Sequence, residues 1–269
     1  MTPSAAKSFA LATVLFAAAA QTLAAQSVPV DLELVLAVDV SGSMDEDEKA
    51  LQRSGYVAAL RHPDVIDAIR SGYLGRIAVT YVEWAGPSSQ ATIVPWRLVD
   101  GAEAAEALAS ELEKAPGPRI RGTSISGALL YAATRFDDSG FAGERRVIDI
   151  SGDGPNNMGP PVEPVREAVL ALDITINGLP VILKNNWGGG LSGETGLDSY
   201  YRDCVTGGPG AFFIAVHDPD QFADAVRRKL VLEIAGHKAE FLPAALPVQL
   251  RQVDCLAGEK WRRRLYEDR

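Results

Sequence analysis

The segment Asp39-Val40-Ser41-Gly42-Ser43 carries three side chains with oxygen atoms at alternate positions. A carboxylate and two hydroxyls on one short loop can bind a hard cation such as Mg²⁺ or Mn²⁺, because such cations prefer oxygen ligands. With only one carboxylate on the loop, a bound cation keeps coordination positions open for other ligands. The alternative interpretation is a serine-rich turn that caps the start of a helix.

Two further oxygen-bearing side chains follow predicted elements of the fold. Thr123 lies in Gly122-Thr123-Ser124, where a helix is predicted to begin, and Asp153 comes shortly after a predicted strand. In open α/β sheets, ligands bind beyond the carboxyl ends of the strands. We therefore expect Asp39, Thr123 and Asp153 to lie at the same edge of the sheet.

The elements that must position these residues alternate along the chain. Near-continuous apolar runs predict buried strands, and apolar residues at helical spacing predict helices. This alternation predicts a doubly wound α/β fold with a mostly parallel six-stranded sheet and helices on both faces. The expected strands cover residues 31–40, 76–84, 92–99, 146–151, 174–179 and 211–216, and the expected helices begin at the acidic segment 45–48 and cover 102–114, 123–136, 162–172 and 222–234.

The third expected strand should lie at an edge of the sheet and run antiparallel to its neighbour. It contains Pro95, which cannot donate a hydrogen bond to a ladder. The second and third strands are joined by the short segment Gly86-Pro87-Ser88-Ser89. A turn of this length permits a hairpin but not the helical crossover that parallel strands need.

The three polar segments together resemble the von Willebrand factor A (VWA) domain. The shared features are Asp-x-Ser-x-Ser after a hydrophobic first strand, Gly-Thr at the start of a helix, and Asp-Gly after the fourth strand. In that family these segments form the metal-ion-dependent adhesion site (MIDAS). The resemblance covers residues 31–236 and implies a VWA/Rossmann-like fold with five metal ligands, namely Asp39, Ser41, Ser43, Thr123 and Asp153.

The later part of the chain resembles an uncharacterised group of exported bacterial proteins with a VWA-like domain. The resemblance rests on Asn177-Gly178-Leu179-Pro180, on Tyr200-Tyr201-Arg202-Asp203-Cys204 and on the segment 207–212. It indicates what the chain is related to but adds no function.

Five other polar or aromatic residues lie near these segments, and for all of them except Glu83 the default interpretation is structural. Asp149 lies inside an apolar strand, which favours a buried, hydrogen-bonded carboxylate over a metal ligand. Trp84 ends the second strand and should pack in the core, whereas Glu83 beside it is a candidate to contact a metal ligand. Asn156 and Asn157 follow Asp153 and are typical turn residues, although they could contact a ligand.

The function that these residues favour is protein recognition through the metal, with a carboxylate of the partner completing the coordination shell. An aspartyl-nucleophile phosphatase would need a second carboxylate two residues after Asp39, where this chain has Ser41. No Gly-x-Ser-x-Gly motif is present either. We therefore expect no enzymatic activity. A metal-dependent hydrolase and a structural assembly factor with a purely stabilising metal are the alternatives.

The composition is that of a globular protein. The chain has 269 residues, of which 47% are hydrophobic and 23% are charged, and its formal net charge is -9. Nucleic acid is excluded as the main partner, because phosphate binding needs a surplus of Lys and Arg.

The first residues have the pattern of a secretory signal peptide. Lys7 precedes the apolar run 9–20, and Thr22-Leu23-Ala24 supplies small residues at a cleavage position. The run is too short to span a membrane, which takes about 20 residues, and no later segment is long and apolar enough. We expect residues 1–24 to be removed and the protein to be periplasmic or secreted.

The two cysteines, Cys204 and Cys255, most simply form one disulfide in an exported protein. Two unpaired thiols, or a bond to a partner, are the alternatives. The three histidines are scattered and give no zinc pattern.

Two segments have no regular pattern. Residues 185–196 are rich in Gly and Asn and should form an exposed loop. Residues 237–269 form a C-terminal extension that contains the cluster Trp261-Arg262-Arg263-Arg264 near its end, which is interpreted as a solvated end or, second, as an interaction arm.

Overall fold

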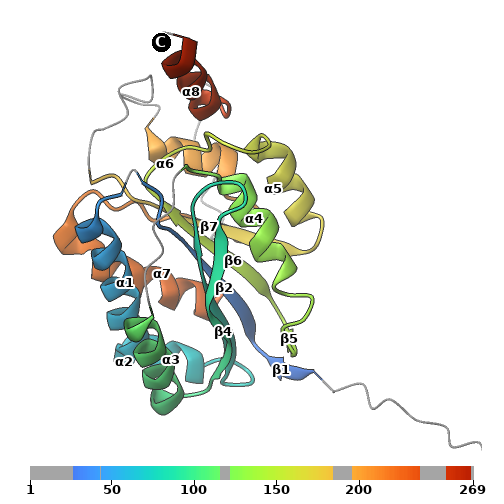
Figure 1. Ribbon diagram of the computed structural model, residues 1–269. Coiled ribbons are helices and arrows are strands. Elements are labelled where there is room, and N and C mark those ends of the chain that lie inside the picture. The colour runs from blue at the N-terminus through green and yellow to red at the C-terminus, as the bar shows by residue number, and fades with distance from the viewer. Residues whose placement is uncertain (1–26, 43, 116–121, 184–195, 237–252, 268–269) are drawn as a thin grey trace, which may run out of the picture.

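The computed structural model describes residues 27–42, 44–115, 122–183, 196–236 and 253–267 (Figure 1). The predicted signal peptide and Ser43 lie outside these residues, as does the predicted loop 185–196 except for Gly196. No helix in the described part of the chain is long and apolar enough to cross a membrane.

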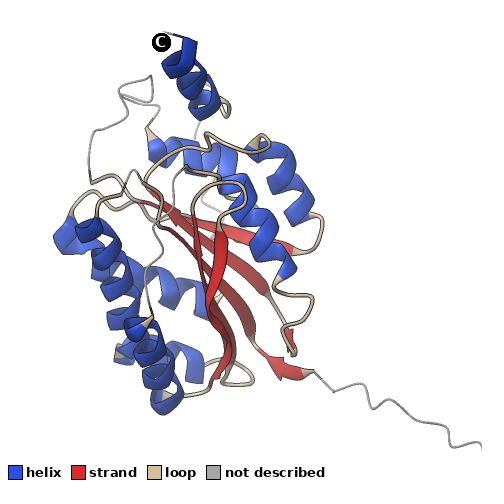
Figure 2. Ribbon diagram, viewed as in Figure 1, coloured by secondary structure: helices blue, strands red, loops and turns tan. Residues whose placement is uncertain are grey.

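A five-stranded sheet lies at the centre of the fold, between two layers of helices (Figure 2). Its strand order is β4-β3-β2-β6-β7, and all neighbours are parallel except β3 and β4. The mostly parallel α/β fold with one antiparallel edge strand is therefore confirmed. The five strands are β2 (Leu32–Asp39), β3 (Ile77–Trp84), β4 (Gln90–Val99), β6 (Arg146–Gly152) and β7 (Ile174–Pro180), while the short β1 (Val28–Val30) and β5 (Phe141–Gly143) pair with each other.

The edge position of β4 agrees with its proline. The register of β3 and β4 shifts between the pairs Val79↔Arg97 and Tyr81↔Val94, so that Pro95 falls in a bulge. The missing N–H of proline therefore removes no regular ladder bond.

The predicted sixth strand, residues 211–216, is wrong as a regular strand. This segment runs beside β7 but makes only the isolated bridges Gly178↔Phe213 and Val181↔Val216. The pairing is irregular because the backbone N–H of Phe212 donates to the side-chain Oδ1 of Asn177, at 3.1 Å, instead of to a strand carbonyl.

The helices form one layer on each face of the sheet (Figure 1). Residues of α1, α2, α3 and α7 share one apolar core with the sheet, and residues of α4, α5, α6 and the π-helical turn η1 share the other. A 3₁₀ turn, η2 (Pro219–Gln221), precedes α7, and α8 lies near the C-terminus. The helices and η1 are α1 (Glu46–Arg61), α2 (Pro63–Arg70), α3 (Ala102–Lys114), α4 (Ile125–Thr134), α5 (Val162–Leu170), α6 (Leu197–Tyr200), η1 (Tyr201–Val205), α7 (Phe222–Ala235) and α8 (Ala257–Glu267).

Strand β2 is buried on both faces, as its continuous apolar run predicts. Leu36 and Val38 belong to the core under α1 and α7, whereas Val35 and Ala37 belong to the core under α4 and α5. Because side chains alternate along a strand, Asp39 continues the second series and points toward the α4 side.

A buried ionic cluster joins α7 to the sheet. The ammonium of Lys229 lies 2.6 Å from Asp149 Oδ1 and also pairs with Glu233, and the side-chain amide of Asn177 donates to Glu233 at 3.0 Å. Asp149 is therefore a buried structural carboxylate, as its apolar strand predicts. Burial, followed by the charge of Asp149, raises the pKa of Glu233 to about 7.

Glu233→Gln should flatten the pH dependence of stability. Between pH 4.5, the ordinary pKa of this carboxyl group, and about 7, folded wild type binds more protons than the unfolded chain. Its free energy of unfolding therefore falls as the pH rises through this window, by up to about 3 kcal/mol. Urea unfolding at several pH values measures the slope. Glu103→Gln, at an exposed position of α3, should keep the wild-type slope, and an unchanged slope in Glu233→Gln would contradict the assignment.

Candidate metal centre

Asp39 is the last residue of β2 and is fully buried. Its Oδ1 accepts a hydrogen bond from the backbone N–H of Ser41 at 2.7 Å. Its Oδ2 is buried and has no hydrogen-bond partner. A buried carboxylate oxygen without a partner is costly, because burial removes the water that would otherwise solvate it.

The hydroxyls of Ser41 and Thr123 meet near this carboxylate although 82 residues separate them in sequence. Both side chains are buried, and Thr123 Oγ1 lies 3.5 Å from Ser41 Oγ. Asn157 holds Thr123 in place, since its Oδ1 accepts from the Thr123 N–H at 3.3 Å and its own N–H donates to the Thr123 carbonyl at 3.1 Å. The expectation that the first two loops meet at one edge of the sheet agrees with this geometry.

Asp153 follows the end of β6 and is partly buried. Burial raises the pKa of Asp39 well above its ordinary value, the negative charge of Asp153 raises it further, and hydrogen bonds from Ser41 and from the backbone of Asp153 oppose the shift. The two carboxylates therefore repel each other in a poorly solvated place. Ser43, the fifth predicted ligand, lies outside the described residues.

This donor set fits a hard divalent cation. Carboxylates and hydroxyls supply only oxygen atoms, and the unpartnered Asp39 Oδ2 is an acceptor that a cation would satisfy. Within the described ranges, no three His, Cys, Asp or Glu side chains gather into a metal-binding group. The candidate centre therefore depends on hydroxyls as much as on carboxylates.

Gln52 of α1 supports the first loop, a role that the sequence analysis did not predict. Its amide donates to the Asp39 carbonyl and to the Met44 sulfur, both at 2.9 Å, and its Oε1 accepts from Ser151 Oγ at 3.2 Å. One buried side chain thus joins the ends of β2 and β6 to α1. A polar residue on the buried face of a predicted amphipathic helix is the signal that could have identified it.

The start of α1 fixes the other end of the first loop. Asp45 is the N-cap, and a capping box joins it to Glu48 through two hydrogen bonds of 2.9 Å. The predicted helix start at the acidic segment is therefore confirmed. Negative side chains in this first turn also interact favourably with the helix dipole.

Asn156 links the third loop to two helices. Its Oδ1 accepts from both the N–H and the hydroxyl of Ser126 in α4, each at 3.1 Å. Its amide donates to Glu259 of α8 at 2.7 Å and to the Pro160 carbonyl at 3.1 Å. Asn156 is thus a fully bonded structural residue that couples the loop after Asp153 to α8.

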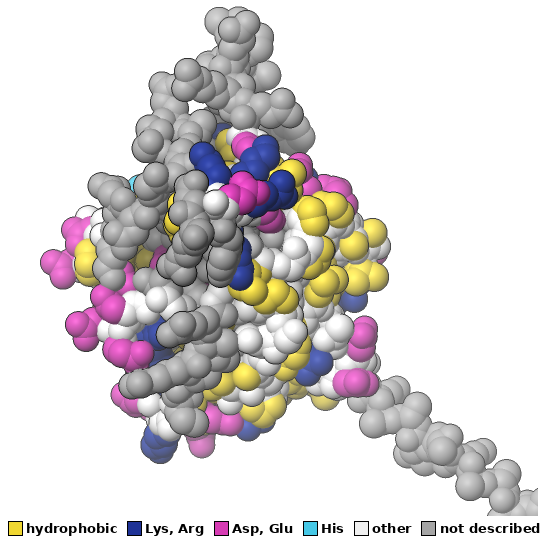
Figure 3. Space-filling view, turned by 45° about the horizontal axis from the view of Figure 1, so that its top comes forward, with side chains coloured by type: hydrophobic (Ala, Val, Ile, Leu, Met, Phe, Trp, Pro, Cys, Tyr) yellow, Lys and Arg dark blue, Asp and Glu magenta, His cyan; other side chains and the backbone are white. Residues whose placement is uncertain are grey.

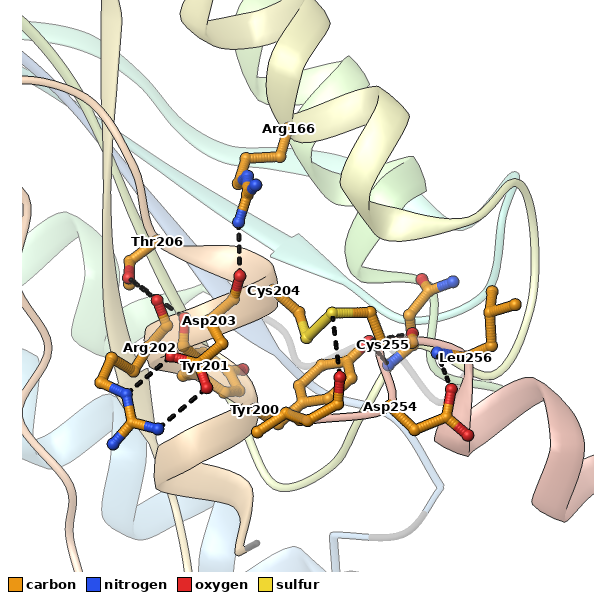
Figure 4. Close-up of a disulfide and its surroundings, with 12 residues drawn as sticks. Arg166, Tyr200, Tyr201, Arg202, Asp203, Cys204, Thr206, Asp254, Cys255 and Leu256 are labelled. Atoms are coloured by element: carbon orange, nitrogen blue, oxygen red, sulfur yellow. Dashed lines mark hydrogen bonds and ion pairs between the residues drawn. A yellow bond between two sulfur atoms is a disulfide. The ribbon is translucent and has the colours of Figure 1, made fainter. Parts of the chain in front are cut away.

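A disulfide joins Cys204 to Cys255, which confirms the predicted pairing (Figure 4). Tyr200 lies beside it, and its hydroxyl accepts from the Asn156 N–H at 3.2 Å and donates to the Cys255 carbonyl at 3.4 Å. The disulfide and this tyrosine therefore hold the C-terminal segment against the third loop of the candidate centre.

Glu83 and Trp84 have separate structural roles. Trp84 is fully buried in the core under α4, as expected. Glu83 pairs with Arg53 of α1 instead of contacting a candidate metal ligand. Since Glu83 and Trp84 are consecutive in β3, Glu83 points to the face of the sheet opposite to Asp39 and Trp84.

Three solved structures show what this architecture is similar to. Proximal thread matrix protein 1 (PTMP1) from the mussel byssus has a TM-score of 0.53 at 15% identity, over 78% of this chain and 49% of its own. A von Willebrand factor type A structure from Catenulispora acidiphila has 0.52 at 14%, over 76% and 43%. The pilus adhesin SpaC from Lactobacillus rhamnosus GG has 0.53 at 14%, over 77% and 30%. The chain thus has the fold of a VWA domain and spans about half, or less, of the length of these structures.

The sequence also matches a family. The pattern of the family described as "Protein of unknown function (DUF1194)" matches residues 29–238, and the chain belongs to this family. No curated protein matches the chain. PTMP1 has also been solved with a zinc-occupied MIDAS motif, and that structure matches with a TM-score of 0.52 at 16% identity.

Reduction of the disulfide should destabilise the protein. The bond spans 51 residues, and a loop of that length contributes about 4 kcal/mol to the free energy of unfolding in the chain-entropy model, often less in practice. Urea unfolding with and without a phosphine reductant measures the difference, and Cys255→Ser should show no response to the reductant. Alkylation of two free thiols without reductant would contradict the pairing, which mass spectrometry of non-reduced digests tests directly.

Proposed function

We propose that this protein is an exported protein-binding module of the VWA type whose binding depends on a divalent metal. One observation carries the proposal: Asp39 Oδ2 is buried without a hydrogen-bond partner at the carboxyl edge of the sheet, under the repulsive influence of Asp153. A divalent cation would satisfy the oxygen and compensate both negative charges.

The metal that the donors favour is Mg²⁺ or Mn²⁺. Asp39 and Asp153 contribute two negative charges, and the hydroxyl ligands contribute none. Once bound, the cation supplies an electrophilic position for an oxygen ligand from outside. The proposed ligands are Asp39, Ser41, Ser43, Thr123 and Asp153.

The partner that this site would recognise is a protein that offers a carboxylate. Five side-chain ligands leave one of six positions for an outside ligand, since Mg²⁺ favours six. A carboxylate can displace the water there. Basic residues lie at the same end of the molecule, where α8 carries the segment 262–264 and Lys260, which pairs with Asp254. Figure 3 shows Lys and Arg side chains, with some Asp and Glu side chains among them, in the upper part of the molecule. Their positive charge is complementary to an acidic partner.

Two similar proteins support this interpretation. PTMP1 has a MIDAS motif that binds zinc, and SpaC is a pilus adhesin. The predicted signal peptide (1–24) and the disulfide suit a periplasmic or secreted protein. The module would cover residues 31–236, followed by the extension 237–269.

We also propose that the protein is not an enzyme. The residue two positions after Asp39 is Ser41, which cannot serve as the acid or base of an aspartyl-nucleophile mechanism as a carboxylate would. Measurable turnover of generic phosphate or ester substrates would favour the hydrolase alternative instead.

The purified protein should bind one Mg²⁺ or Mn²⁺ ion, and Asp39→Ala should abolish the binding. Removing this carboxylate takes away a charged ligand and the acceptor of the Ser41 N–H. Isothermal titration calorimetry measures both proteins. Asp47→Ala removes an exposed acidic group nearby, on α1, and should bind as wild type does. Equal binding by wild type and Asp39→Ala would end the assignment.

Partner binding should require the metal. Thr123→Ala and Asp153→Ala each remove one proposed ligand and should weaken the affinity at least tenfold while the circular dichroism spectrum stays unchanged. A pull-down from the exported fraction, with Mg²⁺ against chelator, would supply the partner, and titration would then give affinities. Full affinity in chelator would show that recognition uses another surface.

A further inference from the structure

Tyr201 places a second unpartnered polar atom beside Asp39. It is the first residue of the π-helical turn η1, is fully buried, and its hydroxyl has no hydrogen-bond partner. Its backbone is fixed, because its carbonyl accepts from the N–H of Thr206 at 2.8 Å and from the Thr206 hydroxyl at 3.1 Å. Single π-helical turns occur frequently at functional sites.

The ring of Tyr201 passes over two glycines on neighbouring strands. A Cβ at Gly178 of β7 would lie 2.6 Å from the ring atom Cδ1, and a Cβ at Gly152 of β6 would lie 2.9 Å from the hydroxyl oxygen. Any larger residue at these two positions would collide with the ring. Because both positions are glycines, the Tyr201 side chain can lie across β7 and β6 with its hydroxyl toward β2.

The hydroxyl of Tyr201 and the carboxylate of Asp39 meet over Gly152. The same Cβ position at Gly152 lies 3.0 Å from Asp39 Oδ2 and 3.2 Å from Trp84 Cζ2, on the edge of the indole that carries the N–H. The Tyr201 hydroxyl, the Trp84 N–H and Asp39 Oδ2 are all buried without a partner. Two donors and one acceptor thus surround one small space.

We propose that Tyr201 is a positioning residue of the metal centre: its hydroxyl donates a hydrogen bond to the Asp39 carboxylate, directly or through one water molecule over Gly152, when a divalent cation is bound. This inference rests on the proposed function. A carboxylate oxygen has two acceptor sites, so Oδ2 can face the cation and accept from the tyrosine together. Hydrogen bonds of this kind fix the orientation of ligating carboxylates and typically contribute 10–100-fold to metal affinity.

The neighbouring tyrosine does not share this role. The hydroxyl of Tyr200 is already bonded to the Asn156 N–H and the Cys255 carbonyl. Of the two consecutive tyrosines, one therefore joins the third loop to the disulfide, and the other is directed at Asp39.

Tyr201→Phe should weaken the binding of Mg²⁺ or Mn²⁺ about tenfold or more, as measured by calorimetry on the purified full chain. Tyr56→Phe is the matched control, since the hydroxyl of Tyr56 is also buried but lies in the core on the other face of the sheet. It should bind the metal as wild type does. Mg²⁺ itself does not absorb in the near ultraviolet, so the change in tyrosine absorbance on Mg²⁺ addition can be measured. This change should occur in wild type and in Tyr56→Phe and be absent in Tyr201→Phe.

Urea unfolding in chelator separates positioning from a structural role. Tyr201→Phe should unfold at the wild-type midpoint, because an unpartnered hydroxyl adds little to the metal-free fold. The inference would be overturned if Tyr201→Phe had a lower urea midpoint in chelator but bound the metal with wild-type affinity and kept the tyrosine difference signal. If wild type itself binds no metal, the proposed function fails first. Should Tyr201→Phe not fold, Gly152→Ala is the second variant. Its added methyl would lie 2.9 Å from the Tyr201 hydroxyl and 3.0 Å from Asp39 Oδ2 and should weaken metal binding, and wild-type affinity in that variant would overturn the inference.

Discussion

The burial of the Asp39 carboxylate is the constraint on which this end of the molecule depends. Strand β2 is apolar on both faces, and the chain then places a charged group at its end with one oxygen bonded to the Ser41 N–H and the other bonded to nothing. Such a group costs several kcal/mol in a folded protein unless a charge or hydrogen bonds compensate it. A bound divalent cation, as proposed, would meet that need and would also compensate the negative charge of the nearby Asp153.

Hydrogen bonds of uncharged side chains hold the loops around Asp39 together, whereas the buried Lys229 pairs with Asp149. Gln52, Asn156 and Tyr200 join these loops through amide and hydroxyl hydrogen bonds. Lys229 of α7 pairs instead with Asp149 and Glu233, on the face of the sheet opposite to the face toward which Asp39 points. Among the described residues, no Lys or Arg side chain forms an ion pair with Asp39, so its negative charge would be available to a cation from outside.

The fold could be predicted from the sequence because strand and helix periodicity are local properties, and the residues at the strand ends followed from the same periodicity. The sixth strand could not, since its pairing is replaced by a side chain, Asn177, from a neighbouring strand. Gln52 and Tyr201 were missed as members of the site for a related reason. Their roles depend on which atoms meet after the helices pack on the sheet, and no spacing in the chain encodes that.

The segments 177–180 and 200–204, for which the sequence indicated only a resemblance to exported proteins, contact each other in the structure. Gly178 makes room for the ring of Tyr201, and Phe213 closes on the same glycine. Cys204 lies three residues after Tyr201 in the same turn and is tied to Cys255, so the turn cannot move away without the C-terminal segment.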